Sequence, residues 1–131
     1  LENQKIFAWY WGHEHRCTIY DQLPSWQMYG RLIGHGGVPQ ERDSFQPGDV
    51  RVRIPAKPGL SWVRVSKRRM IPGAMVPPGL ILDGPNEYVA GEGDPKHFSP
   101  HGYLTLAFNG PRLTEKVLTP DGVEIYSADL A

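Results

Sequence analysis

Residues 102–127 read GYLTLAFNGPRLTEKVLTPDGVEIYS, and this stretch decides the fold of the chain. Three short runs in it alternate apolar and polar side chains with the two-residue period of a β-strand: 102–108, 113–118 and 123–127. Asn109–Gly110 and Pro120–Asp121–Gly122 separate these runs, and both combinations favour tight turns. The stretch therefore predicts a β-meander, in which three antiparallel strands succeed one another along the chain.

The rest of the chain also favours short strands. Residues 6–11 are apolar or aromatic throughout, which predicts a buried strand, and residues 49–55 alternate like a half-exposed one. Further strands are expected at 16–20, 30–34 and 62–67. No stretch has the period of an amphipathic helix, and turn formers are frequent, with 15 glycines and 13 prolines. We expect a single domain over residues 1–131, mainly β, built from short antiparallel strands.

Composition and charge narrow the classes of function. The 14 basic and 14 acidic residues balance, so the chain lacks the positive excess that a nucleic-acid-binding surface needs. No run of about 18 apolar residues is present to cross a membrane as a helix. Cys17 is the one cysteine, which is typical of a reducing compartment and predicts a cytoplasmic protein.

The residues with the most evident chemistry are Gly12–His13–Glu14–His15, directly after the apolar run at 6–11. In an extended chain, side chains two positions apart point to the same side, so His13 and His15 would face one metal ion or a pair of ions. Neutral imidazole is a common ligand of transition metals such as Zn, Fe and Mn. Glu14 would then point away from the ions, on the same side as Arg16, and pair with it.

Two further residues are candidates for substrate binding. His35 lies in the glycine-rich turn 34–37, from which it could contact a substrate phosphate or act as a third metal ligand. Its alternative role is to hold that turn by hydrogen bonds. Arg31 could bind phosphate through its planar guanidinium. The alternative for Arg31 is a solvated charge on a strand.

The chain resembles calcineurin-like metallophosphoesterases, whose last signature is a Gly-His-x-His element after an apolar strand. Residues 30–39, GRLIGHGGVP, and the closing stretch 102–126 are similar to the segments after that element in one bacterial branch of the family. The resemblance implies the C-terminal part of the metallophosphoesterase α/β sandwich. It also implies two divalent ions (Mn, Fe or Zn), with His13 on one and His15 on the other, that activate a hydroxide to hydrolyse a phosphoester substrate.

The family's earlier signatures are absent from these 131 residues. An Asp-x-His, a Gly-Asp-x-x-Asp and a Gly-Asn-His-Asp/Glu hold most of the ligands, the bridging carboxylate and the catalytic histidine in that family. We therefore expect this chain to be the C-terminal portion of a larger hydrolase. Alone it would bind metal weakly and be inactive, and it would depend on the missing N-terminal half of the same protein.

Two other functions remain open on the sequence. The chain could be a non-catalytic β module that binds a partner through its loops, or a self-contained domain with one zinc on His13, His15 and His35. If the chain is a portion of an enzyme, the strand at 7–11 should leave an open edge or an apolar face. Self-association into a homo-oligomer would cover such a surface.

Overall fold

The computed structural model describes residues 5–22, 27–66, 68–71, 74–89 and 95–131. The strands are β1 (Ala8–Trp11), β2 (Cys17–Tyr20), β3 (Tyr29–Ile33), β4 (Val50–Arg53), β5 (Ser61–Val65), β6 (Arg68–Ile71), β7 (Ala74–Val76), β8 (Gly79–Asp83), β9 (Tyr103–Asn109), β10 (Arg112–Leu118) and β11 (Glu124–Asp129). One short 3₁₀ helix, η1, spans Pro95–His97. The expected mainly β class is confirmed. Within the described residues, no helix is long and apolar enough to cross a membrane.

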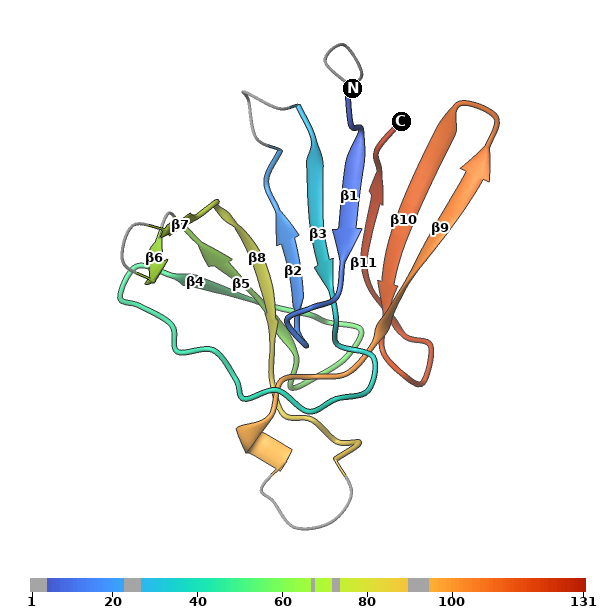
Figure 1. Ribbon diagram of the computed structural model, residues 1–131. Helices are drawn as coiled ribbons and strands as arrows, with labels where there is room; N and C mark the ends of the chain where they lie inside the picture. The colour runs from blue at the N-terminus through green and yellow to red at the C-terminus, as the bar shows by residue number, and fades with distance from the viewer. Residues whose placement is uncertain (1–4, 23–26, 67, 72–73, 90–94) are drawn as a thin grey trace.

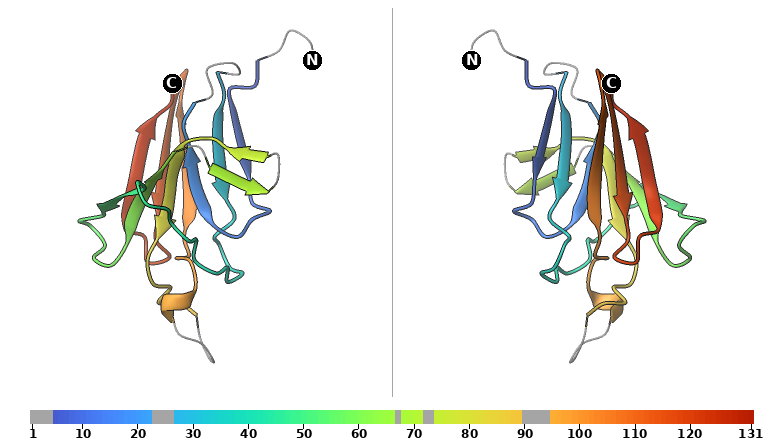
Figure 2. Two further views of the ribbon diagram at one scale, coloured as in Figure 1. Left: turned by 90° about the vertical axis from the view of Figure 1, so that its left-hand side faces the viewer. Right: turned by 90° about the vertical axis from the view of Figure 1, so that its right-hand side faces the viewer.

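Most strands form two sheets that pack face to face as a β-sandwich (Figure 1). The larger sheet has six strands in the order β1-β3-β2-β8-β5-β4, and the smaller has the order β11-β10-β9. Strands β6 and β7 form a separate two-stranded hairpin. Figure 2 shows the smaller sheet, in orange and red, as its own layer on one face of the larger one.

The smaller sheet is the meander that the sequence predicts. β10 pairs antiparallel with both β9 and β11. Asn109 pairs with Arg112, so the two loop residues are Gly110 and Pro111, one position later than expected. Gly110 has a φ of 58°, and a positive φ at the first loop position is the pattern of a type II′ turn, which suits the twist of a hairpin.

The larger sheet departs from the expected all-antiparallel arrangement at one pair. β1 and β3 run parallel, whereas every other neighbouring pair of this sheet is antiparallel. The strand β8, which lies between β2 and β5, has no counterpart among the expected strands. Its apolar run is bounded by Pro78–Gly79 and Gly84–Pro85, and such dense turn signals obscure it. Residue 67, the last of the strand expected at 62–67, lies outside the described residues.

The main core lies between the two sheets. The larger sheet and the loop after β4 contribute apolar side chains, and Trp62 also donates a hydrogen bond from Nε1 to the carbonyl oxygen of Ile125, at 2.7 Å. The buried members of this cluster are Cys17, Ile19, Ile54, Leu60, Trp62, Leu82, Val117 and Ile125. On the opposite face of the larger sheet, Phe45 packs on a second cluster of Val63, Val65 and Ile81. Burial of apolar surface between and over the layers stabilises the sandwich.

Two expected burial patterns are wrong, both at the ends of the larger sheet. The sequence predicts a buried β1, but Trp9 is 52% exposed. It predicts a half-exposed β4, but all four residues of that strand are exposed, Val52 at 53%. The reason is the same in both cases, because among the described residues each of these strands has a neighbour on one side only.

Candidate metal centre

The candidate metal ligands lie in the loop that joins β1 to β2. β3 lies between these two strands, so residues 12–16 must cross its end. Residues 13–16 form bends, and the backbone N–H of Arg16 donates to the carbonyl oxygen of Glu14 at 2.7 Å. The extended geometry expected for this segment is therefore wrong, and strand alternation does not determine where His13 and His15 point.

A close contact between two backbone segments fixes the position of this loop. A Cβ atom added to Gly34 would lie 2.2 Å from the carbonyl oxygen of Glu14 and 2.5 Å from that of Gly12. Both distances are too short for any side chain at position 34. Gly34 also donates from its backbone N–H to the carbonyl oxygen of Arg16, at 3.0 Å. The end of β3 thus supports the loop directly through its main chain.

The two histidines are the uncommitted polar side chains of the loop. His13 is exposed and His15 is half-buried. No hydrogen bond within the described part of the chain involves either imidazole. The other polar side chains are engaged, because Glu14 accepts a 3.0 Å hydrogen bond from Nε1 of Trp11 and Arg16 forms an ion pair with Asp43. The expected pairing of Glu14 with Arg16 is therefore wrong.

His35 lies inside the molecule, at the end of β3. Its side chain is fully buried, and neither ring nitrogen has a hydrogen-bond partner among the described residues. The ring packs against Gly102, where an added Cβ would lie 2.8 Å from Nε2. Burial, and to a lesser extent the nearby His101, lowers the pKa of His35 from 6.5 to about 4. His35 is thus a neutral imidazole at physiological pH.

Arg31 also lies in the interior and is already engaged on all sides. Its Nε and Nη2 donate to the carboxylate of Glu115 at 2.8 Å and 2.7 Å. Its Nη1 donates to the carbonyl oxygens of Tyr20 and Gly30, at 3.0 Å and 2.9 Å. The alternative of a solvated strand charge is wrong, because Arg31 is 2% exposed. The sequence held a signal for this pair, because Glu115 occupies an apolar-face position between Leu113 and Val117.

A third residue completes this buried polar cluster. The hydroxyl of Tyr10 donates to Oε2 of Glu115 at 3.0 Å. Burial and the negative charge of Glu115 both raise the pKa of Tyr10, so its phenol keeps its proton and remains a donor. β1, β3 and β10 are therefore tied together by one carboxylate in the core of the sandwich.

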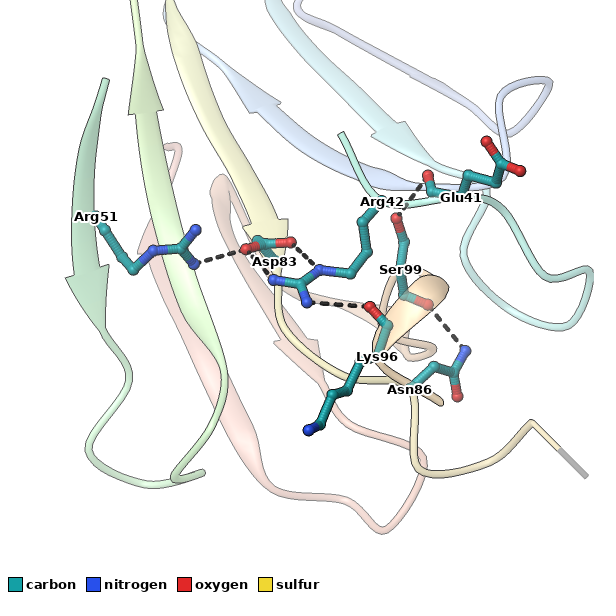
Figure 3. A network of polar contacts seen from close by, with 7 residues as sticks. All are labelled: Glu41, Arg42, Arg51, Asp83, Asn86, Lys96 and Ser99. Carbon is teal, nitrogen blue, oxygen red and sulfur yellow. Dashed lines mark hydrogen bonds and ion pairs between the residues drawn. The ribbon is translucent and has the colours of Figure 1, made fainter. Parts of the chain in front are cut away.

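A second buried carboxylate organises the other half of the larger sheet (Figure 3). Asp83 accepts two 2.7 Å hydrogen bonds from Arg42 and one of 2.6 Å from Arg51. Burial by itself would raise the pKa of Asp83, but the hydrogen bonds from the two arginines hold that pKa below its usual value. Arg42 also donates to the carbonyl oxygen of Lys96, at 3.1 Å. The cluster joins β4, β8, the segment before β4 and η1.

The described residues offer imidazole near the candidate centre but no grouped set of ligands. Among them, no three His, Cys, Asp or Glu side chains come together in a way that could hold an ion. In particular, His35 does not join His13 and His15. The donor chemistry thus fits part of a transition-metal site and lacks the carboxylates that a dinuclear centre requires.

An aromatic pocket lies next to the loop, on the outer face of the larger sheet. The rings of Trp11 and Tyr20 stack, with their centroids 5.6 Å apart and their planes at 9°. Together with Met28, Pro77 and neighbouring residues they line a cavity of about 180 Å³. Trp11 therefore connects this pocket to the candidate metal-binding loop through its hydrogen bond to Glu14.

Comparison of the chain with protein-family models, with curated proteins and with solved structures found no match. The resemblance to metallophosphoesterases therefore rests on the sequence alone, on Gly12–His15 and the segments that follow it.

Proposed function

We propose that this chain supplies one part of a dinuclear metallophosphoesterase centre, in which His13 binds one divalent ion and His15 the other. The loop at the end of β1 supports the proposal, because its two imidazoles are accessible while Glu14 and Arg16 are engaged with other groups. The ions, Mn, Fe or Zn, supply Lewis-acid and water-activating chemistry when bound. The reaction is hydrolysis of a phosphoester.

The chain's own residues have a positioning role in this proposal. Gly34 holds the loop against the end of β3, so a main-chain contact sets where the two imidazoles stand. Trp11 fixes the carboxylate of Glu14 by a hydrogen bond and keeps it from competing for the ions. Arg31 and His35 lie in the interior, on β3 and just after it, and Arg31 joins β3 to Glu115 of β10.

The proposal requires ligands from outside the described residues. Two neutral imidazoles add no negative charge to balance two divalent ions, so carboxylates must come from another segment. In the family that the sequence resembles, the missing signatures precede the Gly-His-x-His element along the chain. We propose that they are carried by polypeptide of the same reading frame that precedes residues 1–131. The isolated chain is then inactive.

The test compares the isolated chain with the product of its complete reading frame. Hydrolysis of p-nitrophenyl phosphate with Mn²⁺ and calorimetric Mn²⁺ binding are measured for both. We expect activity and two bound ions only in the longer product. His13→Ala and His15→Ala should each lower its kcat by more than about 100-fold. His97→Ala is the matched control, because His97 is an exposed imidazole that contacts Glu41, at 3.2 Å, far along the chain from the loop.

Two results would contradict the proposal. Full activity in both loop variants would remove the histidines from the centre. One tight zinc site in the isolated chain, weakened by His35→Ala, would instead indicate the self-contained zinc domain.

A further inference from the structure

The free edge of β1 has backbone groups available for another strand. β1 pairs in the described residues with β3 alone, with Ala8 opposite Tyr29 and Tyr10 opposite Arg31. The N–H of Tyr29 donates to the carbonyl oxygen of Phe7 at 3.0 Å. In a parallel ladder, alternate residues bond to the neighbour, so Phe7, Trp9 and Trp11 bond to β3. The N–H and C=O groups of Ala8 and Tyr10 therefore point outward.

The sequence of β1 is that of an interior strand. Residues 6–11 carry no charge, and four of the six are aromatic. Natural edge strands usually carry charges, prolines or bulges that prevent further pairing, and parallel strands are normally covered on both sides. β1 has none of these protections, and Ile6, Phe7 and Trp9 are each about half exposed.

The smaller sheet extends past β1 and leaves apolar side chains uncovered there. β9 pairs with β10 so that Leu106 lies opposite Glu115 and Phe108 opposite Leu113, which puts them on the inner face of the sandwich. Nevertheless Leu106 is 38% and Phe108 72% exposed. β10 stands over β3 and β1, because Arg31 and Tyr10 both reach Glu115, so β9 overhangs the end of the larger sheet (Figure 1).

We infer that β1 is an interior strand of a wider sheet, and that a further strand pairs with its free edge and covers Leu106 and Phe108. One position next to β1 accounts for all three observations, namely the outward backbone groups, the uncharged aromatic sequence and the uncovered inner face of β9. The docking strand should alternate apolar side chains toward β9 with side chains on the outer face.

The identity of this strand rests on the proposed function. A strand beside β1 passes next to Gly12–His15, where two imidazoles and two divalent ions need carboxylates for charge balance. We therefore assign it to the segment of the same reading frame that carries the missing carboxylate ligands. A second copy of this chain does not meet that need. A symmetric β1–β1 pair is antiparallel, which places the two histidine loops at opposite ends of the paired strands, so neither loop brings its Glu14 to the other.

Amide hydrogen exchange of the isolated chain and of the complete reading-frame product tests this assignment. We expect the amides of Ala8 and Tyr10 to exchange rapidly in the isolated chain and to be protected on the order of 100-fold more in the longer product. Arg51 and Arg53 of β4 serve as internal controls. Ile54 donates from its N–H to the carbonyl oxygen of Leu60, so by alternation the amides of Arg51 and Arg53 point away from β5. Their exchange should not change.

A pair of proline variants gives a second readout in the longer product. Ala8→Pro removes an outward N–H and leaves the ladder to β3 intact, and Arg53→Pro does the same at β4. We expect Ala8→Pro to lower p-nitrophenyl phosphate hydrolysis at least tenfold and Arg53→Pro to leave it unchanged. Circular dichroism of the same variants in the isolated chain checks that each still folds.

The outcomes separate this inference from the proposed function. Hydrolysis without added protection at Ala8 and Tyr10 would overturn the strand pairing and leave the metal centre in place. Protection without hydrolysis would support the pairing and count against the metal centre. Protection that already appears in the isolated chain, rises with its concentration and increases no further in the longer product would make a second copy the occupant and overturn the assignment.

Discussion

β1 and β4 lie at the two ends of the same sheet, but they end it in different ways. β4 carries two arginines whose backbone groups face outward, and Arg51 both binds Asp83 and lies over the ring of Phe45 at 5.6 Å. β1 carries no charge. Trp9 of β1 and Val52 of β4 are almost equally exposed, so exposed apolar surface does not distinguish the two strands. The charges and the direction of pairing distinguish them. β4 is antiparallel and has the charges of a protected edge strand, whereas β1 is parallel and has none.

The largest expected effect is on the free energy of unfolding, when the buried carboxylate near β1, Glu115, is compared with the one near β4, Asp83. Glu115→Ala removes the partner of Arg31 in the core beneath β1, and an unpaired buried charge costs about 3–5 kcal/mol of unfolding free energy. Asp83→Ala should cost less, about 1–2 kcal/mol, because Arg42 and Arg51 are 31% and 46% exposed and can turn to water. Urea unfolding of both variants measures the difference. Equal losses would show that the two sides are anchored alike.

Acid should destabilise the protein first through His35 and only at lower pH through Asp83. The pKa of His35 falls from 6.5 in the unfolded chain to about 4 in the folded one. Below pH 6.5 the unfolded chain binds a proton that the folded chain does not, so stability falls until the pH reaches about 4. The loss amounts to about 3 kcal/mol.

The lowered pKa of Asp83 acts in the same sense but at lower pH, because its stabilisation is lost only as that carboxyl becomes protonated. Urea unfolding at pH 7 and pH 4.5 should therefore show the His35 effect with little contribution from Asp83. His35→Gln should reduce the change in unfolding free energy between these two pH values, and His97→Ala should not. A wild-type protein equally stable at both pH values would contradict the burial of His35.

The loop after β1 should depend on its main-chain contact. Gly34→Ala places a Cβ within 2.5 Å of two carbonyl oxygens, and relief of that overlap should cost about 2 kcal/mol and displace the histidines. Gly37→Ala is the control, because nothing lies within 4 Å of its added Cβ. Thermal unfolding compares the two variants, and chemical shifts of His13 and His15 report the displacement. Unchanged histidine shifts in Gly34→Ala would argue against support from β3.

The smallest effect on stability is expected for charges placed directly on the two strands. Trp9→Lys and Val52→Lys alter side chains of nearly equal exposure and should each change the unfolding free energy by less than about 0.5 kcal/mol. Their effects on association should differ. Sedimentation at high concentration should show self-association of the wild type that Trp9→Lys reduces and Val52→Lys does not. A wild-type chain that stays monomeric at high concentration would count against self-association through the edge of β1.

The parts of the fold that depend on local rules were predictable. The meander and most strands of the larger sheet result from alternation and turn residues, and β1 lies where the apolar run at 6–11 predicts it. The missed strand β8 is five residues long and buried on the sheet's interior, where continuous apolar character replaces alternation. The parallel pairing of β1 with β3 depends on a crossover that no local pattern encodes.

The candidate site shows the same division between local and long-range information. The Gly12–His15 signature is readable because it is contiguous, and the exposure of His13 agrees with a ligand-binding role. The bend at 13–16 is imposed by β3, which the chain reaches only later. The engagement of Arg31 by Glu115 joins residues 84 positions apart. The one sequence signal for this pair is that Glu115 lies on the apolar face of its strand, where a buried carboxylate needs a cationic partner.

The Arg31–Glu115 pair also has a mechanical consequence. Apolar contact is not directional, so two sheets held by apolar side chains alone can shift past one another at little cost in free energy. The guanidinium of Arg31 donates hydrogen bonds to a carboxylate and two carbonyl groups, and this geometry prevents such a shift. If one layer moved relative to the other, a charged group would remain buried without its partner. The pair therefore works as a latch between the layers. It keeps the overhang of β9 at a constant place beside β1.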